Sequence, residues 1–190
     1  MDKIKNNDIK EQRLKIIELL LSTNRKGVEN LIAFLDKSNY FNCYGSFKHH
    51  VYNGGLAKHS LEVYENALKH NKNCDINSII ISSILHDVCK VQNIFPEETI
   101  NYFAFGHGSK SVKILEDYVG FKLTDEERRA IRFHMGSKSR ISSDEEREEY
   151  NKACNEELWE LIHIGDCLSC GNYPNNMHSV VKNIIKVFKL

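Results

Sequence analysis

The amino-acid sequence predicts an all-α fold in a single domain. Apolar residues recur mostly at helical spacing, only two prolines occur among the 190 residues, and no clear strand pattern is visible. A chain of this length fits one domain and is long enough to bury a core of its own. We therefore expect one helical bundle over residues 1–190, with the sequence motifs gathered at about 50–170.

Nine helices account for the apolar periodicity, each with ends defined to within a few residues. They cover about 9–22, 27–37, 55–70, 76–90, 108–119, 124–134, 144–153, 155–169 and 176–189, with loops at 38–54, 91–107 and 135–143. We expect the N-terminal helices at 9–37 and the C-terminal helix at 176–189 to pack on the motif-bearing core.

Two of these helices carry clear start signals. Thr124 precedes a run of three acidic residues, and Ser143 precedes another. A hydroxyl side chain at the N-cap accepts a hydrogen bond from the backbone, and acidic residues in the first turn interact favourably with the helix dipole. We therefore expect helices to begin directly after Thr124 and after Ser143.

The charges of the chain are balanced, with 26 basic and 26 acidic side chains. No field over the whole molecule recruits nucleic acid, so we expect no stable nucleic-acid partner. The stretch Met1–Gln12 is polar and no run of about 18 apolar residues occurs, so we expect neither a signal segment nor a membrane span. These observations predict a cytoplasmic protein without membrane contact.

The six cysteines are scattered through periodic segments, which favours reduced thiols over a disulfide framework. Cys167 and Cys170 are the only close pair, and a structural zinc site would need a second pair. The predicted helix at 176–189 has an apolar face beside three lysines. It is expected to pack on the domain or on a partner subunit, and the second arrangement would make the protein a homodimer.

The stretch Ile81–Lys90 places a histidine and a carboxylate side by side within an apolar run. At about 3.6 residues per turn, one arc of the helix is apolar and the other holds Ser82, Ser83, His86, Asp87 and Lys90. A polar face with His, Asp and Lys is a candidate for metal and phosphate chemistry. The alternative is an exposed polar face on a surface helix.

Three further histidines have positions that favour a role at the same site. His59 lies on the apolar face of its helix, where a hydrogen-bonded core histidine is the alternative to a metal ligand. His107 lies between two glycines, before a helix that Ser109 could cap, so its ring can closely approach a bound group. His134 ends a helix, where a cationic ring would stabilise the dipole without any metal.

Asp166 lies near the end of a strongly apolar helix, where a carboxylate is costly unless it is paired or bound to a metal. With the residues above it completes a set of four imidazoles and two carboxylates. Such a set could hold one or two divalent transition metals, with Fe, Mn, Zn, Ni and Co as candidates. The set consists of His59, His86, Asp87, His107, His134 and Asp166.

The order of His59, His86-Asp87 and Asp166 resembles the HD-domain superfamily of metal-dependent phosphohydrolases, which is all-helical. The resemblance spans about residues 50–170 and is most specific in the segments Tyr52–Ser60, Leu85–Lys90, Gly106–Gly108 and Phe133–His134. These segments are similar to the HD module of a bacterial exoribonuclease family and to small stand-alone HD proteins of bacteria and phages. The chain departs from two specialised groups, since it has neither a Gly-Tyr-Pro signature nor a preceding RNA-binding domain.

The resemblance implies an HD-type helical bundle and a role for each matching residue. Four residues match the ligands of a one-metal HD site: His59, His86, Asp87 and Asp166. Two more match the extra ligands of two-metal members: His107 and His134. Lys90 matches the lysine of the HD-x-x-K form, which would touch a bridging hydroxide or a substrate phosphate.

We therefore expect a phosphomonoesterase or phosphodiesterase that acts on a nucleotide or a related phosphate ester. Asp87 and Lys90 are the expected catalytic residues, because they would orient the attacking water and neutralise charge on the phosphoryl oxygens. The expected substrate contacts are Lys90, His49, His50, Lys138 and Arg140. Two alternatives use the same site, a di-iron oxygenase and a non-catalytic nucleotide-binding module. For His163 we expect a role in packing or in supporting a ligand residue from outside the site.

Overall fold

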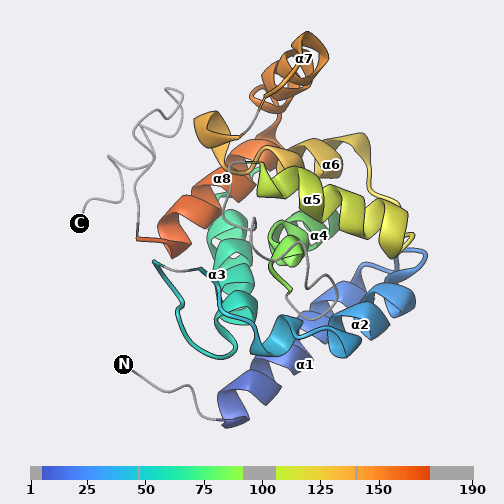
Figure 1. The fold of residues 1–190 in the computed structure, drawn as a ribbon, viewed down its shortest axis with the longest axis vertical. Coiled ribbons are helices and arrows are strands. Elements are labelled where there is room, and N and C mark those ends of the chain that lie inside the picture. The colour runs from blue at the N-terminus through green and yellow to red at the C-terminus, as the bar shows by residue number, and fades with distance from the viewer. Residues whose placement is uncertain (1–5, 47, 92–105, 140, 172–190) are drawn as a thin grey trace.

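The computed structural model describes residues 6–46, 48–91, 106–139 and 141–171. Within these ranges the regular elements are all helical, which confirms the predicted all-α fold. Figure 1 shows how they are arranged. The helix expected at 176–189 and the expected substrate contact Arg140 lie outside the described residues.

The long helices follow the predicted order along the chain. They are α1 (Asn6–Ser22), α2 (Val28–Lys37), α3 (Gly55–His70), α4 (Ile76–Leu85), α5 (His107–Lys113), α6 (Asp125–Arg132), α7 (Asp144–Ala153) and α8 (Glu157–Ser169). Short helical turns connect them: η1 (Tyr40–Asn42), η2 (Val88–Lys90), the π-helical η4 (Ile114–Tyr118) and η5 (Gly136–Lys138).

Helix α4 lies at the centre of the bundle and packs against α1, α3, α6 and α8 (Figure 1). Helices α1 and α2 lie at one end, and α7 projects at the opposite end. The closest packing joins α3 to α8 and α3 to α4. Because α4 is central, the residues at its C-terminal end face several neighbouring helices at once.

Two clusters of buried apolar side chains form the core. The larger one joins α1, α2, α3 and α4 to the segment from α5 to Leu123. The smaller one joins α6, α7 and α8 to single residues of α3 and α4, Ala67 and Ile79. Helix α4 contributes to both clusters, so the burial of apolar surface on both sides fixes its position.

The predicted starts of α6 and α7 are confirmed. Thr124 and Glu127 form a reciprocal capping box, in which each side chain accepts the other residue's backbone N–H. Ser143 accepts the backbone N–H of Glu146 at the start of α7. Glu127 is also fully buried and accepts a 2.6 Å bond from Arg25, which ties the connection between α1 and α2 to α6.

The structure corrects three expectations at helix ends. The helix expected at 76–90 ends at Leu85, and the His86-Asp87 pair lies at the turn before η2. The polar side chains predicted to share one arc of this helix are buried, and Lys90 is only 9% exposed. The alternative of an exposed polar face on a surface helix is therefore excluded. Ser109 does not cap α5, because the helix begins at His107 with Gly106 at the N-cap.

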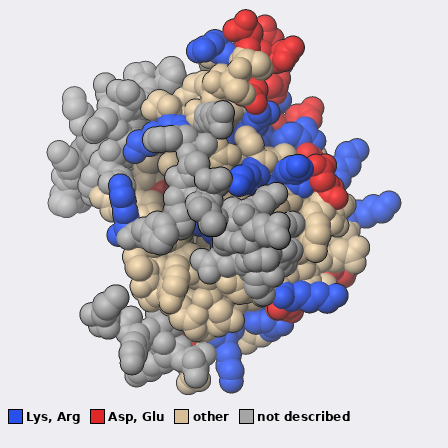
Figure 2. All heavy atoms as spheres, in the orientation of Figure 1, with Lys and Arg blue, Asp and Glu red and all other residues tan. Residues whose placement is uncertain are grey.

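The charges are balanced over the chain but not over its surface. Figure 2 shows acidic side chains gathered at the end of the molecule that α7 forms, and the first turn of α7 carries three of them. In the described part of the chain, no helix combines the length and the apolar character needed to cross a membrane.

Candidate metal centre

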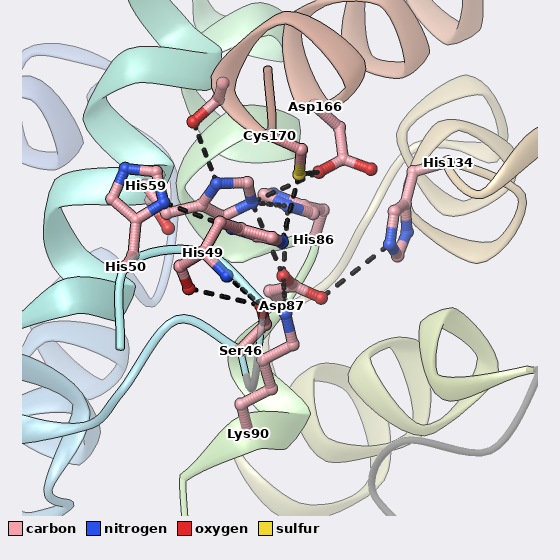
Figure 3. Close-up of polar contacts among 12 residues, drawn as sticks. Ser46, His49, His50, His59, His86, Asp87, Lys90, His134, Asp166 and Cys170 are labelled. Atoms are coloured by element: carbon pink, nitrogen blue, oxygen red, sulfur yellow. Dashed lines mark hydrogen bonds and ion pairs between the residues drawn. The ribbon is translucent and has the colours of Figure 1, made fainter. Parts of the chain in front are cut away.

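The six predicted ligand residues lie together in the structure, at the C-terminal end of α4, and Figure 3 labels all of them except His107. Five different segments bring them there: α3, the end of α4, the start of α5, the turn after α6, and α8. All six are buried, with exposed fractions from zero to 8%. They are His59, His86, Asp87, His107, His134 and Asp166.

Close approaches between helix backbones allow this convergence. A Cβ atom at Gly165 would lie 2.7 Å from the carbonyl oxygen of Val63, so α8 packs directly on the backbone of α3 and brings Asp166 to His59. A Cβ atom at Gly108 would lie 2.4 Å from the carbonyl oxygen of Arg132. The glycine after His107 therefore serves the packing of α5 against the end of α6.

The histidine rings face one another in two pairs. The Nε2 atoms of His59 and His86 are 3.2 Å apart, and those of His107 and His134 are 3.0 Å apart. Asp87 lies between the pairs. Its Oδ2 atom is 3.4 Å from His86 Nε2, and its Oδ1 atom is 3.0 Å from His107 Nε2.

Main-chain carbonyls fix the orientation of two of these rings. His86 Nδ1 lies 2.8 Å from the carbonyl oxygen of Ser83, and His134 Nδ1 lies 2.7 Å from that of Ile131. A carbonyl oxygen only accepts hydrogen bonds, so we assign the Nδ1 proton to both rings. In the neutral rings, the Nε2 lone pairs of His86 and His134 then point into the cluster.

A side-chain relay fixes the third ring. Ser169 Oγ donates to Glu62 Oε2 at 2.9 Å and lies 2.9 Å from His59 Nδ1. Because the serine proton is directed to the carboxylate, Ser169 accepts from His59 Nδ1, and the Nε2 lone pair of His59 also points inward. Outer partners of this kind hold metal-binding histidines in the tautomer that a metal requires.

Asp87 is the carboxylate at the centre of the charge network. Burial alone would raise its pKa, but the charges of Lys90 and His86 hold the pKa well below its usual range. Lys90 Nζ donates a very short hydrogen bond to Asp87 Oδ2. Burial would lower the pKa of Lys90, and the Asp87 carboxylate raises it, so the lysine is charged at neutral pH.

Among the other buried groups, His134 and Asp166 have pKa shifts that suit metal binding, whereas the pKa of His86 is raised. Burial, followed by the charges of His86 and His107, lowers the pKa of His134 to about 3, so this ring is neutral. Burial would raise the pKa of Asp166, but the neighbouring histidines, His59 foremost, lower it. Burial would lower the pKa of His86, while Asp87 raises it. Neutral imidazoles and ionised carboxylates are the forms that bind a metal.

The cluster fits divalent metal ions. Donor atoms about 2.0–2.1 Å from one ion lie about 2.9–3.4 Å from each other when they are neighbours in its coordination sphere. The separations of 3.0–3.4 Å described above match this range. Asp87 Oδ1 is buried and accepts no well-aligned hydrogen bond, although His107 Nε2 lies 3.0 Å away. A bound cation would satisfy this oxygen.

Two groups of three donors share His86 within this cluster. One consists of His59, His86 and Asp166, and the other of His86, Asp87 and His134. In each group the three donor atoms lie within 4.8 Å of one another. The arrangement therefore accommodates one or two metal ions in adjacent positions.

His49 and His50 lie beside His59, in the loop before α3 (Figure 3). The backbone of His50 has a positive φ of 52° and its carbonyl oxygen accepts from Gly45. A Cβ atom at Gly55 would lie 2.0 Å from that oxygen, so the Gly54-Gly55 step makes room for the loop. Both histidines are partly buried at the edge of the cluster.

The remaining candidates lie apart from the six ligands. Lys138 is exposed on η5. His163 stacks on Trp159 at an interplanar angle of 11° and donates from Nδ1 to the carbonyl oxygen of His134. The expected packing role of His163 therefore agrees with its contacts.

Three polar residues near the cluster were not among the site residues predicted from the sequence. They are Glu62, Ser169 and Cys170. Glu62 follows His59 by three residues, and Ser169 and Cys170 follow Asp166 by three and four, so each lies about one helical turn from a predicted ligand. That spacing was the available signal, but it is common in any polar helix.

The chain matches the family model described as HD domain over residues 56–164, which is more than half of its length. The match includes five of the six cluster residues and ends just before Asp166. The chain has no significant match among the curated proteins or among the solved structures. The chain belongs to the HD-domain family, most of whose members are metal-dependent hydrolases.

Proposed function

We propose that the protein is a metal-dependent phosphohydrolase that acts on a nucleotide or a related phosphate ester. One observation carries the proposal: the buried Lys90 lies against the carboxylate of Asp87, which lies between two pairs of imidazoles. The lysine distinguishes this site from a plain metal-storage cluster, because an ammonium group is suited to a phosphoryl oxygen but cannot bind metal while protonated.

The proposed metal ligands are the six residues of the cluster, which fit one or two divalent ions by their spacing and tautomers. When bound, such an ion supplies positive charge and makes a water nucleophile available by lowering its pKa toward about 7. Mn, Fe, Co, Ni and Zn are all compatible with imidazole and carboxylate donors.

The chain's own residues would then do three things. Lys90 has three ammonium protons, of which one is directed to Asp87, so the others remain for a phosphoryl oxygen. Asp87 holds Lys90 and accepts from the attacking water, which orients it. Burial of the whole cluster strengthens these electrostatic interactions by excluding bulk water.

Contacts with the rest of the substrate are proposed for the rim. His49 and His50 lie beside His59 and are partly buried, so they would touch the group attached to the phosphate. Lys138 is exposed and would attract a phosphate rather than hold it in the cluster. Arg140 is proposed as a second basic contact on sequence grounds alone.

A panel of nucleotides and simple phosphate esters tests the proposal. Metal-free full-length protein would be loaded separately with Mn, Fe, Co, Ni and Zn, and phosphate release and product formation would be measured. The chelated protein and a His86→Gln variant serve as blanks, because His86 belongs to both groups of three donors. We expect turnover of at least one ester, with metal only.

Two other results would overturn the proposal. Oxygen uptake by the iron-loaded protein without ester hydrolysis would identify an oxygenase. Tight nucleotide binding without turnover under any metal would identify a binding module.

A further inference from the structure

Cys170 and His49 form a second group of metal-binding atoms beside the six-residue cluster (Figure 3). Cys170 Sγ lies 3.0 Å from His49 Nε2 and 3.6 Å from Asp166 Oδ1. The thiol comes from the end of α8 and the imidazole from the loop before α3. The thiol of Cys170 thus lies close to two chemically different donors, an imidazole and a carboxylate, at the edge of the cluster.

The spacing of these donors suits one cation. A zinc ion binds a thiolate at about 2.3 Å and an imidazole at about 2.0–2.1 Å, so tetrahedral neighbours lie about 3.5 Å apart. The two observed separations, 3.0 and 3.6 Å, lie on either side of this value. A thiolate, an imidazole and a carboxylate are ligands that zinc and cobalt accept together.

A chain of hydrogen bonds prepares the His49 ring for this role. His50 Nε2 lies 2.9 Å from Glu62 Oε2, so we assign its proton there, and His50 Nδ1 becomes an acceptor. His49 Nδ1 lies 3.1 Å from that atom and donates to it. The Nε2 lone pair of His49 is then directed at Cys170 Sγ, as in metal-binding histidines whose second nitrogen donates outward.

We propose that Cys170 and His49, with Asp166 as a bridge to the six-residue cluster, form an additional binding position for a borderline-soft divalent cation such as Zn²⁺. Binding breaks the S–H bond and forms a metal–sulfur bond, and the proton leaves to solvent. The thiolate would favour zinc or cobalt over harder ions such as Mg²⁺ at this position. The proposal rests on Asp166 being part of the proposed metal centre.

Cobalt substitution of the full-length protein tests this position. A thiolate bound to Co²⁺ gives a sulfur-to-metal charge-transfer absorption, which imidazole and carboxylate ligands do not give. Metal content per chain would be measured on the same samples. The variants are Cys170→Ser, Cys170→Ala and His49→Gln, and Cys167→Ser is the control because Cys167 is also partly buried, on the same helix.

We expect the wild-type protein and Cys167→Ser to show the absorption and to hold one more cobalt than the Cys170 variants. His49→Gln should lose both the absorption and the extra ion. Far-UV circular dichroism checks the fold, and the two Cys170 variants must agree.

Equal cobalt content in all variants with no charge-transfer absorption would overturn the proposal and leave a thiol–imidazole hydrogen bond. Absorption that persists in His49→Gln would also overturn it, because Cys170 would then bind an ion of the six-residue cluster. Neither readout depends on ester turnover, so failure of the proposed hydrolase activity is recognised separately.

Discussion

The two sides of the metal centre are held in place by different means. On one side, His59 is oriented by Ser169 and Glu62, two side chains from α8 and α3. On the other, His134 is oriented by a main-chain carbonyl, and His107 is placed by the contact of a glycine with the backbone of α6. We call these the α3–α8 side and the α5–α6 side.

The difference determines which substitutions can change the orientation of the ligands. A side-chain relay can be removed one group at a time, so the α3–α8 side can be adjusted by single mutations without moving a helix. A carbonyl belongs to the backbone, so the α5–α6 side changes only when a helix shifts. The predictions below separate the two sides, starting with the residue that both share.

Asp87→Asn should have the largest effect, because Asp87 touches histidines of both sides. We expect no detectable turnover and loss of metal. The buried Lys90 loses its counter-charge, which costs about 3–5 kcal/mol of stability. The double variant Asp87→Asn/Lys90→Met should recover much of this stability without recovering activity, as measured by denaturant unfolding and phosphate release. Full activity of Asp87→Asn would exclude the proposed hydrolase.

Lys90→Ala should keep the metal and lower the rate by about a hundredfold, because it removes one group that stabilises developing charge. Both kcat and kcat/KM should fall together. Lys138→Ala is the comparison, since Lys138 is exposed and should affect KM alone. Metal analysis decides the outcome: loss of metal from Lys90→Ala would show that the lysine supports the site and does not act on phosphate.

Ser169→Ala tests the α3–α8 side. It removes the acceptor of His59 Nδ1, and losing such an outer partner lowers metal affinity by about 10–100-fold. Ser111→Ala is the control, because Ser111 is a fully buried serine on α5 that bonds to the backbone of Cys89, with no ligand involved. Competition with a metal-binding dye measures both affinities. Equal affinity in the two variants would mean that the relay does not orient His59.

Gly108→Ala tests the α5–α6 side and should have the smallest effect on rate. The new methyl group meets two carbonyl oxygens at 2.4 and 2.5 Å, so α5 must shift at a cost of about 1–3 kcal/mol. We expect the protein to keep metal on the α3–α8 side and lose any ion held by His107. Ser109→Ala, one residue on, should be neutral because Ser109 does not cap the helix. Thermal unfolding and metal content per chain distinguish these outcomes.

Most of the helical order could be predicted because apolar periodicity and capping residues are local signals. Thr124 and Ser143 placed two helix starts correctly. The end of α4 at Leu85 could not be predicted, because the helical spacing of apolar residues continues past the His86-Asp87 pair to Val88. Packing on several neighbours, not a local stop signal, decides where that helix ends.

The sequence also identified the six residues that meet in the cluster, because a histidine or carboxylate in an apolar helix demands a partner. It did not identify Ser169 or Glu62. These two meet only because Gly165 allows α8 to approach the backbone of α3, a contact between segments about a hundred positions apart. Their role therefore follows from tertiary packing, which no local pattern encodes.

The ion pair between the partly exposed Arg25 and the buried Glu127 bears on which segment of this protein must be inherited together. Arg25 lies outside the stretch that matches the HD-domain model, and Glu127 lies inside it. Tyr40, also outside, donates to the carbonyl oxygen of Ile84 at 2.7 Å, two residues before His86 of the His-Asp pair. The segment that matches the family model is thus shorter than the segment that folds. Recombination at the edges of the matched segment would separate Glu127 from Arg25 and leave a buried carboxylate without its counter-charge.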